Sequence, residues 1–333
     1  MAERGVMDEF LLKIPGSTSN LGPGFDSFGL SLPLYLTVRL RRSLSSRDHV
    51  SFAGEGFHPS QPIPADNLFL AAYHRGLARF ADSPRRSYYD IALHNAIPLK
   101  RGLGSSGACV IAALLSAALV TEQFPSLDDI LSLAVELEGH GDNVTPALLG
   151  GFTITLAGDS LCYRSYPVMP SLQALVIIPS LQLATSRARA VLPVTVPIGD
   201  ARDNIARAAL LVTALLLGDL SVLPEAARDA LHQPYRQQLL PYLQPMIELS
   251  YAHGSLATFL SGSGPAFLCL VRAGGEELGE CLCLAMEEDF SQPSRYQLLF
   301  LDSAGALVAA PGHGELSWKD SCRWQQSLRA SRR

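Results

Sequence analysis

The first half of the chain alternates between short strand-like runs and longer stretches with helical spacing. Leu34 to Leu40 places an apolar side chain at every second position, which is typical of a half-buried strand. In Asp66 to Phe80 and in Leu127 to Leu137 the apolar residues recur every three or four positions, which predicts amphipathic helices. A run of small apolar residues from Ala108 to Val120 predicts another helix. Residues 10 to 155 are therefore expected to form one mixed α/β unit.

The second half repeats this alternation. Strand-like runs are found at Ala174 to Pro179, Phe267 to Val271 and Tyr296 to Phe300, and the helical stretch Arg202 to Leu217 lies between the first two. Strands and helices thus interleave in both halves, which predicts an α+β protein of two units.

The predicted boundaries divide the chain into three parts. An N-terminal domain covers residues 8–160, a C-terminal domain covers residues 170–315, and a basic tail covers residues 317–333. The tail carries several arginines among polar residues, so it is expected to be flexible.

Composition and charge narrow the class of protein. A chain of 333 residues with 48% apolar and 17% charged content can bury large cores in one or two domains. The net charge of −5 argues against a general nucleic-acid binder. The apolar runs fall short of the roughly 20 residues that span a bilayer, and the first residues do not resemble a signal peptide. We therefore expect a cytoplasmic protein that binds neither membrane nor nucleic acid, whose six cysteines are reduced and show no zinc spacing.

The strongest chemical signal is the glycine- and serine-rich segment from Pro98 to Gly107, which leads directly into the run of small apolar residues. Glycines permit a sharp turn, and a helix that begins near Ser105 would direct its free N–H groups at an anion. Gly102, Gly104 and Gly107 also fit the spacing of the dinucleotide-binding fingerprint, but that motif needs a buried strand before it and none is present. The Walker motif is absent too, because no Lys-Ser or Lys-Thr follows the glycines. Taken alone, the segment fits a phosphate site and an ordinary glycine-rich turn equally well.

Two further loops of similar composition favour the phosphate site. Pro15 to Gly29 and Leu260 to Ala266 are rich in Gly, Pro and small polar residues, and each lies between apolar strand-like runs. Three such loops in this order resemble the three motifs of the GHMP kinases, which phosphorylate small molecules.

Within that superfamily the chain resembles the homoserine kinases most. The resemblance rests on Asn20 to Asp26, on Glu138 to Gly151, on Thr185 to Pro193 with Arg189 inside it, and on His232 to Arg236. It covers residues 10 to about 310. One departure is a glycine at position 141, where many relatives have proline, and this change removes no polar group.

The resemblance implies both a fold and a reaction. The fold would be the two-domain GHMP kinase fold, with a ribosomal-S5-like N-terminal domain, a ferredoxin-like C-terminal domain and the active site between them. The reaction would be ATP-dependent phosphorylation of the side-chain hydroxyl of L-homoserine to O-phospho-L-homoserine, in threonine biosynthesis. ATP and Mg²⁺ would be required, and relatives suggest a homodimer.

The nucleotide and metal sites follow from the motifs. The residues expected to bind ATP are Asn67, Leu68, Pro98, Lys100, Arg101, Gly102, Leu103, Gly104, Ser105, Ser106 and Gly107. The first two would lie near adenine, following the family's pattern, although Asn67 also fits a helix start. Mg²⁺ would be held by the Ser106 hydroxyl and by Glu138, with Glu136 as the second choice. Alternatively, both glutamates only solvate a helix end.

The substrate site is assigned by charge complementarity, because homoserine offers a carboxylate, an ammonium and a hydroxyl. Arg189 and Arg236 can bind the carboxylate bidentately, and Asp26 can take the ammonium. The remaining residues expected near the hydroxyl or closing the pocket are Asn20, His140, Asn143 and Asn204. A surface arginine or a lone histidine is more often structural, so these assignments depend on the family pattern.

The mechanism is less constrained than the reaction. Asn143, His140 and Asp142 are the predicted catalytic residues, and only His140, Asp142 and Asp26 could act as a general base. Our hypothesis is that alignment and electrostatic stabilisation dominate, with the proton lost late to a phosphate oxygen or to solvent. Two alternatives stay open: another GHMP kinase acting on a different alcohol, and a non-catalytic sensor with the same fold.

Overall fold

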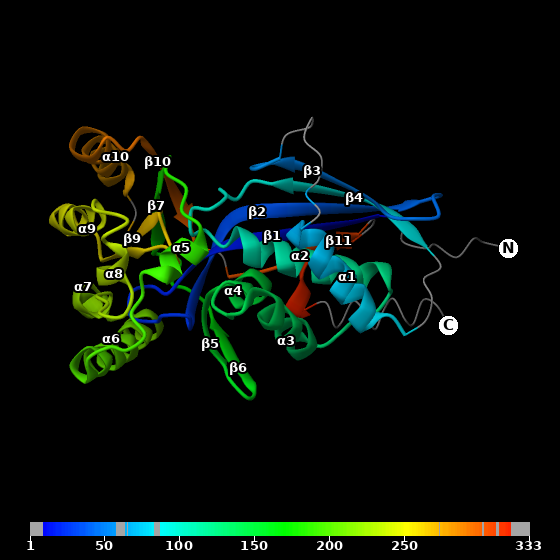
Figure 1. The fold of residues 1–333 in the computed structure, drawn as a ribbon, viewed down its shortest axis with the longest axis horizontal. Helices are drawn as coiled ribbons and strands as arrows, with labels where there is room; N and C mark the ends of the chain where they lie inside the picture. Colours follow the sequence, from blue (N-terminus) through cyan, green and yellow to red (C-terminus); the bar gives the residue numbers. More distant parts are fainter. Residues whose placement is uncertain are drawn as a thin grey trace.

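The computed structural model describes residues 9–57, 64, 66–82, 87–272, 274–301, 303–310 and 313–320, and they form two units (Figure 1). The first unit contains β1 (Glu9–Ser19), β2 (Phe28–Ser43), β3 (His49–Gly54), α1 (Leu68–Phe80), β4 (Tyr88–Asn95), α2 (Ser105–Val120), α3 (Leu127–Glu138), α4 (Val144–Leu149), β5 (Phe152–Ala157), β6 (Leu161–Tyr166), β11 (Leu307–Ala310), β12 (His313–Ser317) and η2 (Trp318–Asp320). The second contains β7 (Gln173–Pro179), α5 (Thr185–Ala190), α6 (Ile198–Leu217), η1 (Leu220–Val222), α7 (Leu223–Ala226), α8 (Gln233–Arg236), α9 (Leu243–Ala252), β8 (Ala257–Leu260), β9 (Phe267–Val271), α10 (Glu276–Phe290) and β10 (Ser294–Phe300). Two α+β units are thus confirmed.

The first unit is a sheet with helices packed against one face. Its strand order is β12-β11-β1-β2-β4-β3, with β5 and β6 continuing from β2. The central helix is α2, in which every residue from Val110 to Val120 is buried between the sheet and the neighbouring helices α1 and α3. A helix that is apolar on all sides is stable only in such a position, so α2 carries the glycine-rich loop at its N-terminus on a rigid support.

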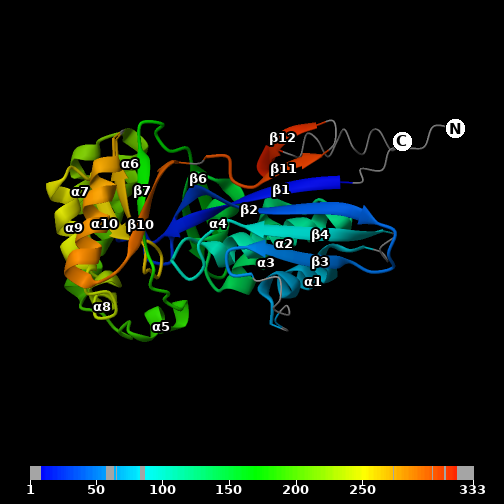
Figure 2. The same ribbon diagram turned by 90° about the horizontal axis from the view of Figure 1, so that it is seen from above.

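The second unit is an antiparallel sheet of order β10-β7-β9-β8. Figure 2 shows α6, α7, α9 and α10 on the side of this sheet that faces away from the first unit. Side chains of β7 alternate between two cores, because Leu175 and Ile177 pack with helices of the second unit while Ala174 and Val176 join the core that continues into the first. The shared core fixes the two units relative to each other.

The C-terminal boundary differs from the prediction. Strands β11 and β12 lie in the first sheet, where β11 pairs with β1, so the C-terminal domain does not extend to residue 315. The first residues of the predicted flexible tail are also packed, because Trp318 is buried and Lys319 Nζ donates to the carbonyls of Leu149 and Ser303. The rest of the tail, residues 321–333, lies outside the described residues.

Individual elements agree with their predicted positions, with shifts at the ends. The helix predicted from Arg202 begins earlier, at Ile198, and the helix predicted from Asp66 begins at Leu68 because Asn67 caps it. The first loop is shorter than Pro15 to Gly29, since β1 continues past a bulge at Pro15 and pairs with β2 up to Ser19. No helix in the described part of the chain is long and apolar enough to cross a membrane.

Candidate active site

A cavity of about 440 Å³ lies between the two units and is lined by residues of all the predicted motifs. It is lined by every residue predicted to bind nucleotide, metal or substrate, except Gly107 and Asn204. The structure therefore brings together side chains that are more than 200 positions apart in the chain, from Asn20 to Ser263. This cavity is the candidate active site.

The phosphate loop ends in a helix N-terminus, as predicted. Helix α2 begins at Ser105, and its N-cap Gly104 has a left-handed backbone with φ of 70° and no side chain to cap the first N–H groups. The loop packs tightly, because a Cβ added to Gly104 would lie 2.1 Å from Ser17 Oγ. Uncapped N–H groups at a sixteen-residue helix, facing a cavity, form an anion-binding site.

The other two glycine-rich loops hold the phosphate loop in place. Ser261 Oγ donates to the carbonyl of Gly102 at 2.6 Å and lies 2.8 Å from Thr18 Oγ1. The backbone N–H of Ala266 also donates to the carbonyl of Arg101 at 3.2 Å. All three motifs therefore meet at one point behind the phosphate loop.

The two cations of the loop have different surroundings. Arg101 donates from Nε to the carbonyl of Pro179 and from Nη2 to that of Ser180, both at 2.7 Å. Its guanidinium thus links the loop to the second unit. Lys100 also lines the cavity, and its ammonium makes no hydrogen bond to the described residues. Lys100 is therefore the better placed cation for a bound phosphate.

The predicted adenine end of the cavity is apolar. Asn67 and Leu68 line it, and the Asn67 side chain also caps α1 by accepting from the N–H of Leu70 at 3.1 Å. Phe52 and Phe57 stack there with ring centroids 4.9 Å apart, and the sequence analysis missed them. Their signal was weak, because single aromatic residues in a strand and a loop usually belong to a core.

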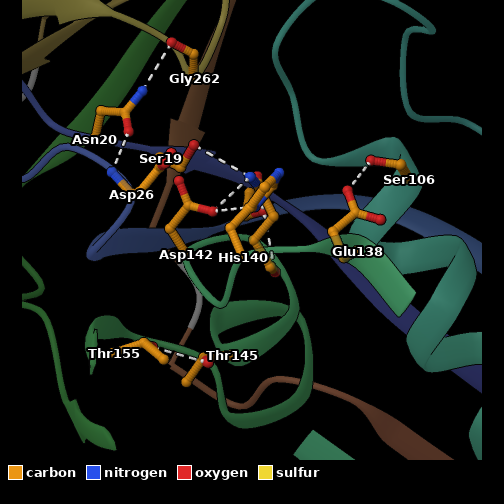
Figure 3. Close-up of polar contacts among 12 residues, drawn as sticks. Ser19, Asn20, Asp26, Ser106, Glu138, His140, Asp142, Thr145, Thr155 and Gly262 are labelled. Carbon is orange, nitrogen blue, oxygen red and sulfur yellow. Dashed lines mark hydrogen bonds and ion pairs between the residues drawn. The ribbon is translucent and has the colours of Figure 1, made fainter. Parts of the chain in front are cut away.

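A hydroxyl and a carboxylate meet beside the helix N-terminus. Ser106 Oγ donates to Glu138 Oε1, and both residues line the cavity (Figure 3). Burial raises the pKa of Glu138, and the hydrogen bond from Ser106 offsets only part of this effect. Glu136 is exposed and forms an ion pair with Arg75, so the geometry favours Glu138 over Glu136 as the metal ligand.

The donor set fits a magnesium ion. Hard oxygen ligands from one carboxylate and one hydroxyl leave most coordination positions for phosphate oxygens and water, which Mg²⁺ prefers. No group of three or more His, Cys, Asp or Glu side chains that could hold a metal occurs among the described residues. Two protein oxygens suit a magnesium ion whose other ligands are phosphate oxygens and water.

His140, Asp142 and Asn143 form a hydrogen-bonded network, of which Figure 3 labels His140 and Asp142. His140 Nδ1 lies 2.6 Å from Asp142 Oδ1, and Asn143 Nδ2 donates to the same oxygen at 3.2 Å. Burial alone would lower the pKa of His140, but the hydrogen bond and charge of Asp142, together with Glu138, outweigh it and raise that pKa. A histidine with a raised pKa holds its proton to higher pH. Such a histidine is better suited to donate a hydrogen bond to phosphate than to act as a general base.

Asn143 is held by two serines of the first loop that the sequence analysis did not single out. Ser17 Oγ donates to Asn143 Oδ1 at 3.0 Å, and Asn143 Nδ2 donates to Ser19 Oγ at 3.1 Å. Gly107, which does not line the cavity, packs beneath them: a Cβ added there would lie 2.9 Å from Asn143 Cβ. These contacts were not predictable from the sequence because they join residues more than 120 positions apart.

The predicted substrate charges are already paired with each other. Arg189 donates to both oxygens of Asp26, at 2.8 and 2.9 Å, and both side chains are partly exposed to the cavity. The hydrogen bond to Asp26 raises the pKa of Arg189. An amino acid that carries both a carboxylate and an ammonium can exchange partners with this pair.

Arg236 is almost completely buried behind the cavity. It donates from Nη1 to the carbonyl of Gly262 at 3.0 Å and from Nε to that of Ala188 at 3.3 Å, and Nη1 faces His232 Nδ1 at 3.0 Å. Within the described part of the chain Nη2 makes no hydrogen bond. One donor of this guanidinium is therefore left for a ligand in the cavity.

Two predicted substrate residues have structural partners instead. Asn20 Nδ2 donates to the carbonyl of Gly262 at 2.9 Å, and Asn20 Oδ1 accepts from the N–H of Asp26 at 2.9 Å. Asn204 is buried outside the cavity, where it donates to the carbonyl of Pro23 and accepts from the N–H of Ala230. Asn204 therefore does not close the pocket, and it fixes the first loop against the second unit.

Comparisons with known proteins agree with the geometry. The model of the GHMP kinases N terminal domain matches residues 67–151, and that of the GHMP kinases C terminal domain matches residues 211–288. Homoserine kinase of Aquifex aeolicus is 36% identical over 272 residues, covering 81% of this chain and 90% of that protein. Homoserine kinase of Carboxydothermus hydrogenoformans is 37% identical over 281 residues, covering 83% and 88%. The crystal structure of homoserine kinase from Cytophaga hutchinsonii covers 93% of this chain and 100% of its own, with a TM-score of 0.80 and 26% identity.

The tight approach at Gly104 yields a prediction. Gly104→Ala and Gly254→Ala both place a side chain on a left-handed backbone, which costs about 1–2 kcal/mol. Only at Gly104 would the new Cβ also meet another residue, since nothing lies within 4 Å of the Cβ position at Gly254. We expect Gly104→Ala to weaken ATP binding at least tenfold by calorimetry, and Gly254→Ala to leave it unchanged. Equal ATP affinities in the two variants would contradict the assignment of the phosphate loop as the ATP site.

Proposed function

Because the chain belongs to the homoserine kinases of the GHMP kinase superfamily, we propose that it transfers the γ-phosphoryl group of ATP to L-homoserine. The acceptor is the side-chain hydroxyl and the product is O-phospho-L-homoserine, in threonine biosynthesis. The observation that carries the proposal is the position of Asp26, Arg189 and Arg236 in the same cavity as the phosphate loop.

ATP would bind along the floor of the cavity. The triphosphate would lie against the N–H groups of residues 102–107 with Lys100 beside it, and adenine would lie at the apolar end near Asn67 and Leu68. The helix N-terminus stabilises negative charge there, and the stacked rings of Phe52 and Phe57 offer a surface for the base.

Mg²⁺ would be held by the Ser106 hydroxyl and the Glu138 carboxylate. When bound, it neutralises charge on the transferring phosphoryl group. The raised pKa of Glu138 supports this assignment, because a carboxylate that is costly to bury as an anion is stabilised by a cation.

Homoserine would replace the ion pair between Arg189 and Asp26. Its ammonium would form an ion pair with Asp26, and its carboxylate would accept hydrogen bonds from Arg189 and from the free Nη2 of Arg236. A zwitterion can do this without leaving either charge unpaired. Galactose is uncharged, and mevalonate has a carboxylate but no ammonium, so neither can satisfy both members of the pair. The pair therefore argues against the mevalonate- or galactose-like acceptors of other GHMP kinases.

Catalysis would rest on alignment and charge stabilisation. Once homoserine is bound, Asp26 would be occupied by the substrate ammonium, and Asp142 accepts from Asn143 and pairs with His140, so neither carboxylate is well placed to take the hydroxyl proton. His140, with its raised pKa, suits donation to a phosphate oxygen as negative charge develops. These contacts support a mechanism without a dedicated base, in which Asn143 and Asp142 orient His140 and the reacting hydroxyl.

The acceptor is tested by measuring ADP release with Mg-ATP and L-homoserine and by identifying the product with ³¹P NMR. L-serine, mevalonate and galactose serve as parallel acceptors. We expect kcat/KM for L-homoserine to exceed the others at least a hundredfold. Turnover of another alcohol would point to a different GHMP kinase, and binding of homoserine without ADP release would point to a sensor.

The metal assignment gives a matched pair of variants two residues apart. Glu138→Gln removes the buried carboxylate beside Ser106, so we expect kcat to fall roughly a hundredfold at saturating Mg²⁺, by analogy with the loss of one electrostatic contact to the transition state. Glu136→Gln alters only an exposed ion pair and is expected to change kcat less than twofold. The steady-state rates of both variants decide between the glutamates, and the reverse order would reassign the ligand.

We also propose that the enzyme is a cytoplasmic homodimer. The described cysteines are free thiols, which suits a reducing compartment. The outer face of α6 exposes Ile198, Ile205, Leu210 and Leu217 at 87%, 72%, 44% and 82% of their surface. Ile198 and Ile205 are seven residues apart, and so are Leu210 and Leu217. In two antiparallel copies of α6, Ile198 would therefore lie opposite Leu217 of the other copy, and Ile205 opposite Leu210.

This dimer is tested by light scattering. Ile205→Arg places a charge at the centre of the proposed contact and is expected to yield a monomer. Leu284→Arg, at an exposed leucine of α10, is the control and is expected to stay dimeric. A monomeric wild-type protein at tens of micromolar would refute the proposal.

A further inference from the structure

Phe25 lies next to Asp26 in the first loop, and its ring touches both arginines of the substrate site. The guanidinium carbon of Arg189 lies 5.9 Å from the ring centroid and that of Arg236 lies 5.7 Å from it. On the same ring His232 stacks with its centroid 5.4 Å away and the planes 27° apart. Phe25 is half-buried and is not among the residues that line the cavity.

Arg189 and Arg236 would both bind the substrate carboxylate. Before the substrate binds, their two positive charges repel each other. Burial, followed by the charge of Arg189, lowers the pKa of Arg236 to about 10. Asp26 compensates Arg189 directly through two hydrogen bonds, but Arg236 is bonded only to carbonyls and to His232 within the described residues. The carboxylates of Asp26, Asp229 and Asp142 raise the pKa of Arg236, but burial and Arg189 outweigh them, so a further source of negative potential would stabilise its charge. The face of an aromatic ring supplies one.

His232 does not add a third positive charge to this cluster. It is completely buried, and burial lowers its pKa, so the ring is neutral near pH 7. Its Nε2 lies 2.8 Å from the carbonyl of Gly22 and so carries the proton, which leaves Nδ1 to accept from Arg236 Nη1. His232 thus fixes the ring of Phe25 on one side and the guanidinium of Arg236 on the other.

We propose that Phe25 is a positioning residue that holds the guanidiniums of Arg189 and Arg236 in place to receive the substrate carboxylate together. The inference rests on the proposed function, because it assumes that this carboxylate belongs to the phosphoryl acceptor. The ring acts through its π face, which attracts both cations, and through its rigid shape, which keeps them separated. A branched aliphatic side chain of similar size would keep the packing but lose the attraction.

The test compares three variants. Phe25→Leu removes the π face and Phe25→Tyr retains it. Phe28→Leu removes a nearby phenylalanine, at the start of β2, that packs edge-on against Phe152. We expect Phe25→Leu to raise both KM and the calorimetric Kd for L-homoserine about tenfold, as the loss of two partly buried cation–π contacts implies. The kcat and the KM for ATP should stay within twofold. Phe25→Tyr should lie within threefold of wild type, and Phe28→Leu should lower only the melting temperature.

A second acceptor isolates the carboxylate. 3-Amino-1-propanol has the ammonium and hydroxyl of homoserine but no carboxylate, so Phe25→Leu should bind it as well as wild type does. An equal loss for both acceptors, or a loss in Phe25→Tyr as large as in Phe25→Leu, would overturn the proposal and leave a packing role. Wild-type protein that binds homoserine without phosphorylating it would refute the proposed function. The ratio of the Kd for L-homoserine in Phe25→Leu to that in wild type would still test the role of Phe25.

Discussion

The structure depends on one close contact between backbones, where the three glycine-rich loops meet behind the cavity. The hydroxyl of Ser261 reaches the carbonyl of Gly102, and the carbonyl of Gly262 accepts from both Asn20 and Arg236. A Cβ at Gly102 would lie 2.0 Å from the carbonyl oxygen of Ser261, so no side chain fits between the loops. The three loops come from both units. Their close contact therefore fixes the position of the phosphate loop relative to the substrate arginines.

Two pairs of opposite charge stand in the cavity before any ligand binds, while Lys100 and Arg236 have no carboxylate hydrogen-bonded to them among the described residues. Asp26 faces Arg189 and Asp142 faces His140, while Glu138 has only a hydroxyl and an elevated pKa. Such a site favours a ligand that brings both charges to the Asp26–Arg189 pair, and a polyanion beside Lys100 and the phosphate loop. A zwitterionic amino acid and a metal-bound triphosphate are ligands of that kind.

The sequence predicted the parts of the site that depend on local chemistry. The glycine-rich loop with its helix and the pair Ser106–Glu138 followed from residue type and motif order, and Asp26 and Arg189 were both assigned to the substrate site, although their ion pair with each other was not predicted. Other features depend on partners far along the chain, and no local pattern reports them. Arg101 donates to carbonyls at the end of β7 and just after it, Asn204 donates to the first loop, and Phe25 contacts two arginines of the second unit. For the same reason the pairing of β11 with β1 escaped prediction.

That pairing has a consequence for synthesis of the chain. Leu11 lies opposite Ala309, so the first sheet cannot be completed until nearly the whole chain has left the ribosome. Contacts of such high sequence separation form slowly, and an unpaired strand edge on β1 stays exposed while the second unit is made. The two units are therefore not independent folding modules. The N-terminal unit lacks its last two strands until the end of synthesis, and during this interval the open edge of β1 can pair with the wrong strand.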